Sequence, residues 1–320
     1  MKEPLVSIII PIFNGEKYIP EIINNLDNLH YKNFEAIFVN DGSTDDTKKI
    51  LSNFNKTYIK YIEQENSGVS VARNKGLQVS LGEFIFFVDV DDLIHNDILN
   101  IFIEEMSTNN CDVLFCDSSS ILEKINTGSY EIDIYNRNSA LRDFILRKIH
   151  TGVCGLFVKK KLLDEYNLSF KEGFAYSEDL HMVLRIFNST NKIIHIKLPL
   201  YVYKKNDGSA MTKINDKRLD SIYLMKDLEF YFVKTNETFS PFFLKYGVSR
   251  TSWALLWQVV RYCDYDTFMK FLKKYDFNSD MKKLLTFPNI KVKVSSFIFI
   301  VSKRLYYCIV KIITKGYRIN

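Results

Sequence analysis

The first half of the chain alternates short apolar runs with segments whose apolar residues recur at helical spacing. Residues 5–10 are mostly β-branched and predict a strand that ends at Pro11, whereas Ile19, Ile22 and Ile23 share one face of a predicted helix. Further strands are predicted at residues 34–39, 58–62, 84–88 and 113–115, and helices at residues 17–29, 44–54, 69–79 and 97–106. This alternation, with short connections, predicts an α/β fold with a mainly parallel, doubly wound sheet.

Polar, turn-forming residues follow each of the first four predicted strands. These segments are residues 11–15, 40–44, 63–68 and 89–92. In the second segment, Ser43 and Asp46 resemble a capping box for the next helix. Ligands of open α/β sheets bind outside the carboxyl ends of the strands, so the four segments together predict a ligand site at one edge of the sheet.

The fourth strand ends in Asp89, Asp91 and Asp92, three carboxylates within four residues. Carboxylates this close destabilise one another unless a cation or hydrogen-bond donors neutralise them. Mg²⁺ and Mn²⁺ prefer oxygen ligands, and either ion would also attract a phosphate. A solvated acidic turn that caps the next helix is the alternative, and the convergence of the other strand ends favours the metal.

The second half of the chain is less regular. Residues 117–137 are polar, as in a mobile loop, and residues 153–158 and 193–203 resemble strands. Helices are predicted at residues 140–149 and 161–166, and another begins near residue 177. From about residue 219 helical periodicity dominates, which predicts a C-terminal helical region.

Composition and charge narrow the class of protein. Of the 320 residues 47% are hydrophobic and 25% are charged, as in an ordinary folded protein, and the five scattered cysteines form no C-x-x-C pair. We therefore expect a reduced cytoplasmic protein with neither a disulfide framework nor a zinc site. The N-terminus does not resemble a signal peptide, and no window reaches the roughly 18 apolar residues of a membrane span.

Five motifs in this order resemble the family 2 glycosyltransferases with the GT-A fold, in particular those of bacterial surface-polysaccharide biosynthesis. The motifs are residues 6–14, residues 40–45, Gly68 with residues 72–74, residues 89–92 and residues 177–179. The resemblance implies a Rossmann-like GT-A domain and inverting transfer from a nucleotide sugar, usually a UDP-sugar. It implies a nucleotide-sugar-binding half at residues 1–115, an acceptor and catalytic-base half at residues 116–212, and a C-terminal helical region at residues 213–320.

On the donor side, the resemblance implies that Asp41 accepts the uracil N–H, that Pro11 and Phe13 line the same pocket, and that Arg73 contacts the base. Asp41 as a turn-shaping residue and Arg73 as a solvated helical arginine remain open as alternatives. The residues expected to bind the nucleotide sugar are Pro11, Phe13, Asn14, Asp41, Asn66, Gly68, Arg73, Asp89, Asp92 and Lys204.

The acidic stretch matches the family's D-x-D motif. By resemblance Asp91 is a ligand of Mg²⁺ or Mn²⁺, and Asp89 contacts the ribose or the same metal. The metal would neutralise the diphosphate and act as a Lewis acid while the leaving group gains charge. Asp92 would accept hydrogen bonds from the donor sugar or cap the next helix.

Asp179 is the candidate general base. Inversion by a single displacement needs a carboxylate that takes the acceptor proton on the face opposite the leaving group. Acids also occur in first helical turns because they complement the helix dipole, and Glu178 fits that role. Further along, residues 201–209 resemble the family's closing segment, where Lys204 replaces the more frequent arginine and would supply charge to the diphosphate without a bidentate fork.

The basic character of the chain belongs to its tail. The formal net charge is +5, and residues 281–320 contain nine Lys or Arg and no Asp or Glu, so the first 280 residues carry −4. Residues 288–320 mix these cations with apolar residues, as in segments that bind anionic membrane surfaces. A helical subdomain packed on the core is the alternative, and nucleic-acid binding is not expected because the basic charge is confined to one apolar-rich tail.

These features together predict a metal-dependent inverting glycosyltransferase, cytoplasmic or peripheral on the inner face of the cell membrane. It would use a UDP-sugar and a saccharide or lipid-linked saccharide acceptor. A non-catalytic UDP-sugar-binding scaffold is the alternative, although Asp91 and Asp179 argue against it because a binding module needs no general base. A nucleotidyltransferase would show a Gly-rich, basic N-terminal loop, which residues 11–14 are not.

Overall fold

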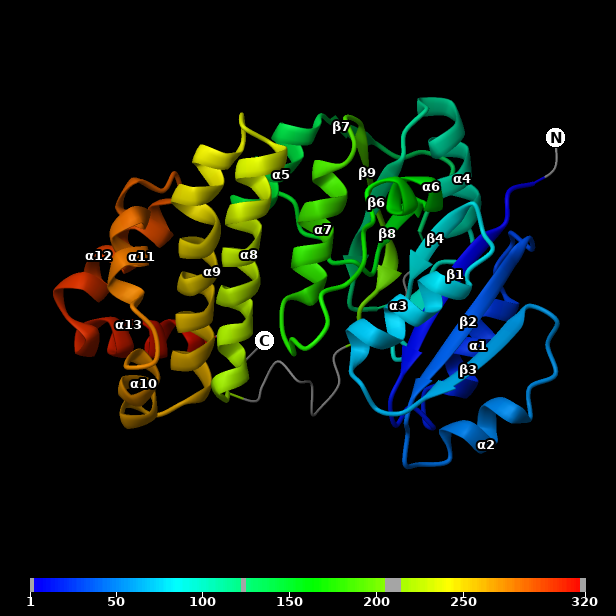
Figure 1. Ribbon diagram of the computed structural model, residues 1–320, viewed down its shortest axis with the longest axis horizontal. Coiled ribbons are helices and arrows are strands. Elements are labelled where there is room, and N and C mark those ends of the chain that lie inside the picture. The colour runs from blue at the N-terminus through cyan, green and yellow to red at the C-terminus, as the bar shows by residue number, and fades with distance from the viewer. Residues whose placement is uncertain (1–2, 122–124, 205–213, 317–320) are drawn as a thin grey trace. The chain divides into compact units, whose positions relative to one another are not determined.

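The computed structural model describes residues 3–121, 125–204 and 214–316 (Figure 1). Contacts within the chain separate two compact units. The first comprises residues 1–140, 150–174 and 178–205, and the second comprises residues 141–149, 175–177 and 206–320. All the candidate site residues belong to the first unit. The expected boundary between residues 212 and 213 lies outside the described residues.

A sheet of nine strands forms the centre of the first unit, in the order β3-β2-β1-β4-β8-β6-β9-β5 with β7 paired to β9. The strands are β1 Val6–Ile12, β2 Phe34–Asp41, β3 Ile59–Gln64, β4 Phe84–Phe87, β5 Leu93–Ile94, β6 Val113–Ser119, β7 Ile132–Tyr135, β8 Leu156–Lys159 and β9 Ile193–Val202. The helices before residue 200 are α1 Ile19–Asp27, α2 Thr47–Ser52, α3 Val69–Val79, α4 Ile98–Asn109, α5 Arg137–Ile145, α6 Lys160–Glu165 and α7 Glu178–Asn188.

Strands β3, β2, β1 and β4 are mutually parallel, as the alternating pattern predicts. The prediction that Pro11 ends β1 was wrong, because the strand continues to Ile12 and Pro11 pairs in register with Val39. The ladder of β1 with β4 stops at Ile9. The N–H that Pro11 lacks would point to the side where β4 has already ended, so the proline costs no ladder bond.

Beyond β4 the sheet is mixed. Strand β8 runs antiparallel to β4 and β6, β9 runs parallel to β6, and β5 and β7 pair antiparallel with β9. The α/β fold class is confirmed, but among the described strands beyond the first four only β6 and β9 pair in parallel. Residues 117–137, expected as a loop, contain the end of β6 and the half-exposed edge strand β7, whose short run gave little periodic signal.

Alternate residues of β1 bury into the two faces of the sheet. Ile8 and Ile10 join a core cluster with Ile22 of α1 and Phe102 of α4. Helix α3 packs on the opposite face, where a Cβ on Gly76 would lie 2.4 Å from Cγ2 of Ile9. Glycine therefore sets how closely α3 approaches β1.

The second unit is helical over its described residues from Asp216 onward, so the predicted C-terminal helical region is confirmed. Its elements are the 3₁₀ helices η2 Asp216–Leu219 and η3 Leu284–Thr286 and the helices α8 Asp220–Thr235, α9 Ser240–Tyr262, α10 Tyr265–Leu272, α11 Phe277–Lys283, α12 Ile290–Val301 and α13 Lys303–Gly316. Helix α9 packs against α8, α11 and α13. Among the described residues, no helix is both long and apolar enough to cross a bilayer.

Candidate active site

Loops from three neighbouring strands meet at the carboxyl edge of the parallel strands. The register pairs Ile12 with Asn40, and Asp41 with Gln64, so β1, β2 and β3 end side by side. Asn14, at φ 53°, ties the first two loops together because its backbone N–H donates to Ser43 Oγ at 2.9 Å and its Oδ1 accepts from the Thr44 N–H at 2.8 Å. Asn14, which is predicted to bind the donor, thus also holds the first two loops together.

The predicted capping box at residues 43 and 46 was wrong. Helix α2 begins at Thr47, and Asp46 at its N-cap makes no side-chain capping bond. Ser43 Oγ instead donates to Asn40 Oδ1 at 2.6 Å, and Asp45 Oδ1 accepts from the Thr47 N–H at 3.1 Å. Ser43 therefore closes the loop after β2, and Asp45 binds the first N–H of the helix instead.

Asp41 is almost completely buried at the end of β2. Its Oδ1 accepts from Gln64 Nε2 and from the Ser67 N–H, and its Oδ2 accepts from the Gly68 N–H, each at 2.8 Å. The carboxylate therefore fixes the loop that leads into α3, which is a different loop from the Asp41-Gly42 turn of the turn-shaping alternative. A carboxylate has about four lone-pair sites, so one further donor is compatible with these three bonds.

Two glycines shape the same loops. Gly42 has φ +67°, and a Cβ there would lie 2.7 Å from the backbone nitrogen of Asn66. Gly68 has φ +93° at the N-cap of α3, with no heavy atom within 4 Å of a Cβ built on it. The first position requires glycine for both conformation and space, and the second for conformation alone.

Arg73 joins the acidic strand end to helix α7. One terminal nitrogen donates to Asp89 Oδ1 at 2.9 Å and the other to Glu178 Oε1 at 3.2 Å, with the Arg73 side chain 6% exposed. Burial alone would lower the pKa of Arg73, but the negative charges, led by that of Asp89, outweigh it and raise the pKa. Arg73 is thus not a solvated helical arginine. Its two terminal nitrogens are engaged with carboxylates, and contact with a nucleobase stays a prediction.

Asp92 is buried and caps no helix, because α4 begins at Ile98 with Asp97 at its N-cap. It accepts from the Tyr201 hydroxyl at 2.7 Å and from the Lys204 N–H at 3.0 Å. Burial raises the pKa of Asp92 to about 7, with smaller contributions from the charges of Asp89 and Asp91. The carboxyl group therefore links the acidic loop to the end of β9.

The donor set at the end of β4 fits a divalent metal that takes part of its coordination from substrate. Asp89 and Asp91 offer the oxygen ligands that Mg²⁺ and Mn²⁺ prefer. Among the residues the structure describes, no group of three or more His, Cys, Asp or Glu side chains could enclose a metal. Mg²⁺ is commonly held by one or two carboxylates together with substrate phosphates and water, so this pair suits a metal bound with a diphosphate.

Asp179 lies in the first turn of α7, directly after the buried Glu178. Its Oδ1 accepts from the Leu180 N–H at 2.7 Å, and its Oδ2 lies 3.5 Å from the position of a Cβ on Gly152. Burial, and next the charge of Asp179, raise the pKa of Glu178, while Arg73 opposes the rise. The Arg73 guanidinium therefore lies between Asp89 and Glu178, and Glu178 directly precedes the candidate base Asp179.

The remaining predicted residues lie around this edge with different exposures. Pro11 is buried, whereas Phe13 is 52% exposed and Asn66 is exposed in the loop after β3. The Lys204 ammonium pairs with Glu21 of α1. Its contact with a diphosphate stays a prediction, and residues 205–209 of the expected closing segment lie outside the described residues.

Two contributors were missed by sequence reasoning. Tyr201 donates to Asp92 and accepts the Asp89 N–H at 3.3 Å, so it holds both ends of the acidic loop. Glu178 was interpreted only as a complement to the helix dipole, but it is the second partner of Arg73. Tyr201 is the first residue of the predicted closing segment, but its hydrogen bonds to the acidic loop left no local signal, and nothing local to residue 178 indicated a partner 105 residues earlier.

Comparison with protein families decides the class. The model for glycosyl transferase family 2 matches residues 7–166, which is half of the 320-residue chain. The chain belongs to glycosyl transferase family 2. The family match contains the D-x-D motif and Arg73 but ends before α7, so it does not extend to Asp179.

Individual relatives extend this result. The minor teichoic acid biosynthesis protein GgaB of Bacillus subtilis (strain 168) is 32% identical over 270 residues, 78% of this chain and 29% of GgaB. Residues 1–349 of S. aureus TarS, in a crystal structure with UDP-GlcNAc, share the fold with a TM-score of 0.66 at 20% identity, covering 99% of this chain and 92% of that one. The mannosyltransferase PcManGT of Pyrobaculum calidifontis, in complex with GDP-Man and Mn²⁺, has a TM-score of 0.58 at 16% identity. The match covers 100% of this chain and 89% of that chain.

Proposed function

We propose that this family 2 glycosyltransferase moves a sugar from a UDP-sugar to a saccharide or lipid-linked saccharide acceptor of a bacterial surface polysaccharide, with inversion and with help from a divalent metal. The observation that carries the proposal is the bridge from Asp89 through Arg73 to Glu178, because it brings the D-x-D motif close to the candidate base. UDP-GlcNAc in TarS and the teichoic acid role in the name of GgaB support this class of donor and acceptor.

On the donor side, the loops fixed by Asn14 and Asp41 would receive the nucleoside. Asp41 Oδ2 accepts one hydrogen bond, from the Gly68 N–H at 2.8 Å, and would use its remaining lone pair for a uracil N–H. Asp91 and Asp89 would hold Mg²⁺ or Mn²⁺ against the diphosphate. When bound, the metal supplies Lewis-acid stabilisation of the negative charge that develops on departing UDP.

On the acceptor side, Asp179 would take the proton of the acceptor hydroxyl. The acceptor oxygen forms a bond to the anomeric carbon while the bond from that carbon to the UDP oxygen breaks, and the electron pair leaves with UDP. Attack from the face opposite UDP inverts the anomeric centre. Arg73 would act as a positioning residue, since its pairing with Glu178 fixes the helix turn that presents Asp179.

A screen for UDP release tests this function. Purified protein is incubated with each common UDP-sugar, with Mn²⁺ or Mg²⁺ and with a chelator, in the presence and absence of saccharide acceptors. We expect metal-dependent release of UDP with at least one donor, and a product of inverted configuration. UDP binding without release or transfer from any donor would instead favour a UDP-sugar-binding scaffold.

A further inference from the structure

Helix α12 carries an apolar stripe on its exposed side. Ile290, Val294, Phe297 and Val301 follow one another at intervals of four, three and four residues and are 70, 47, 58 and 64% exposed. The opposite side of the helix faces the interior of the unit with two apolar residues and two serines, and Phe299 there is 1% exposed. A helix at the surface of a globular domain normally presents polar residues outward, so this stripe needs a partner.

Helix α13 carries an exposed apolar stripe of its own. Leu305, Cys308 and Ile312 are exposed at intervals of three and four residues, which places them on one side of the helix. The opposite side buries Tyr306 and Val310 completely or nearly so. Both helices therefore expose an apolar side, and we call these seven exposed residues the α12–α13 surface.

Three cations accompany this surface. Lys291 and Arg304 are exposed, Lys293 is half-buried, and none of the three makes an ion pair with a carboxylate among the described residues. The Lys291 ammonium lies over the Trp257 ring, 4.4 Å from its centroid. The sequence supplies no Asp or Glu from residue 281 to the end. The surface is therefore apolar with a basic margin, and its charge is complementary to an anionic partner.

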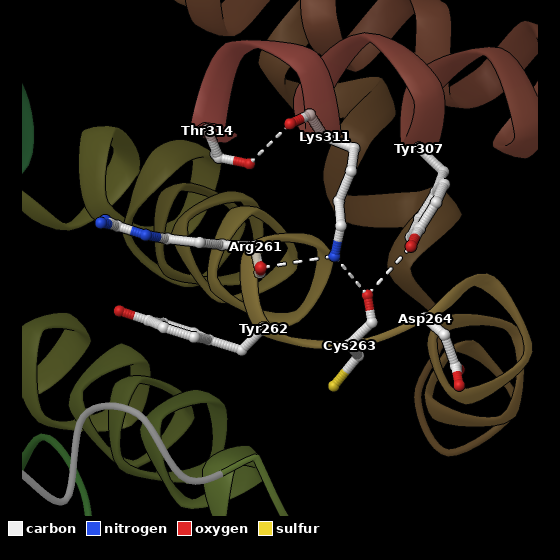
Figure 2. A pocket seen from close by; sticks show the side chains of 7 residues that line it. All are labelled: Arg261, Tyr262, Cys263, Asp264, Tyr307, Lys311 and Thr314. Atoms are coloured by element: carbon white, nitrogen blue, oxygen red, sulfur yellow. Dashed lines mark hydrogen bonds between the residues drawn. The ribbon is translucent and has the colours of Figure 1, made fainter. Parts of the chain in front are cut away.

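Other cations of the same segment are used inside the unit. Lys311 donates to the carbonyl oxygens of Val260 and Cys263 at 2.9 and 2.7 Å, and Figure 2 shows its ammonium group pointing at the end of α9 rather than outward. Lys303 donates to Phe299 O and to Asn278 Oδ1, each at 2.6 Å. The charge available to a partner is therefore smaller than the sequence count suggested and is concentrated near α12.

We propose that the α12–α13 surface docks on an anionic phospholipid bilayer. Exposed apolar residues would enter the membrane interface while Lys291, Lys293 and Arg304 lie against the headgroups.

A second copy of the chain fits this surface less well. A two-fold symmetric dimer places the same patch of both subunits face to face. The cations Lys291, Lys293 and Arg304 of one copy would then meet those of the other with no acidic residue of the segment to compensate. An anionic bilayer satisfies the apolar stripe and the cations at once.

Vesicle flotation tests the docking surface without requiring turnover. The full chain is mixed with vesicles of phosphatidylcholine alone or with phosphatidylglycerol added, at low and high salt. We expect flotation only with the anionic vesicles, weakened by salt. Phe297→Ser should lower the partition coefficient about tenfold, whereas Phe230→Ser, which alters a 64% exposed phenylalanine on α8, should leave it unchanged.

Several outcomes would overturn the docking proposal. One is the absence of flotation on anionic vesicles. Another is an equal effect of Phe297→Ser and Phe230→Ser on the partition coefficient. The third is a dimer that forms without vesicles and that Phe297→Ser dissociates. Since flotation is measured without donor or acceptor, a chain that binds vesicles but releases no UDP would refute the proposed function and not this inference.

Discussion

Replacing Arg73 with methionine removes the cation that joins Asp89 to Glu178 and keeps much of the apolar stem. The Glu178 side chain is 11% exposed and would lose a charged partner 3.2 Å away, whereas the Asp89 side chain is 34% exposed and retains more access to water. The main loss therefore falls on Glu178. Breaking a buried ion pair by removing one partner costs about 3–5 kcal/mol.

The double variant Arg73→Met/Glu178→Gln removes both charges and should recover much of this loss. A coupling free energy of about 2–4 kcal/mol is expected from the cycle. As the matched surface control, Lys48→Met breaks the exposed pair with Glu63, which is 2.7 Å long, and should cost at most about 1 kcal/mol. Urea unfolding followed by circular dichroism measures five proteins: the parent chain, Arg73→Met, Glu178→Gln, the double variant and Lys48→Met.

The cost of Arg73→Met should also depend on pH. In the folded chain the pKa of Glu178 is already raised above its ordinary value, and losing Arg73 raises that pKa further. The folded state then binds more protons than the unfolded state, so stability falls as pH rises through the folded pKa. The single variant should therefore approach the parent chain as pH falls from neutral towards the ordinary pKa of glutamate. A loss of stability no larger than that of Lys48→Met, or no recovery in the double variant, would refute this account of Arg73.

Three further perturbations have defined outcomes. In Gly42→Ala the new Cβ would lie 2.7 Å from the Asn66 backbone nitrogen, so this variant should lower the free energy of unfolding by about 3 kcal/mol. In Gly68→Ala the new Cβ meets no heavy atom within 4 Å, so this variant should lower it by about 1 kcal/mol. Equal melting temperatures of the two variants would refute the close approach of Gly42 to Asn66. Asp92→Asn should flatten the dependence of melting temperature on pH, because a folded pKa of about 7 makes the parent chain lose stability as pH rises from about 4 towards 7; an unchanged profile would contradict this. A chelator should abolish sugar transfer in a coupled UDP assay, and transfer that persists without metal would count against the role given to Asp91.

The alternating half of the chain was predictable because its signals are local. Strands β1 to β4 and helix α3 follow from apolar runs and helical spacing, and the turn residues after the strands indicated an edge of the sheet at which their loops meet. The mixed half was not predictable in the same way. Strand β8 is only four residues long, and its antiparallel place between β4 and β6 depends on partners far away in the sequence.

The candidate site shows the same division. Motif spacing indicated Asp41, Asp89, Asp91 and Asp179, but not how the chain holds them. The bond from Arg73 to Glu178 spans 105 residues and the bond from Tyr201 to Asp92 spans 109, so neither can be derived from periodicity. Likewise, the basic tail was visible in the sequence, whereas the use of Lys303 and Lys311 inside the helical unit was not.

The central claim is that Asp179 takes the acceptor proton in a UDP-sugar transferase. The most direct measurement compares UDP affinity and initial transfer rate for the parent chain and Asp179→Asn, with the donor found in the release screen. Asp266→Asn is the control, because Asp266 is also the second residue of its helix but lies on α10 of the other unit. Transfer by Asp179→Asn should fall by at least about a hundredfold, the scale of general-base catalysis, with UDP affinity and melting temperature nearly unchanged. Retained turnover, or a parallel loss of UDP binding, would contradict the assignment.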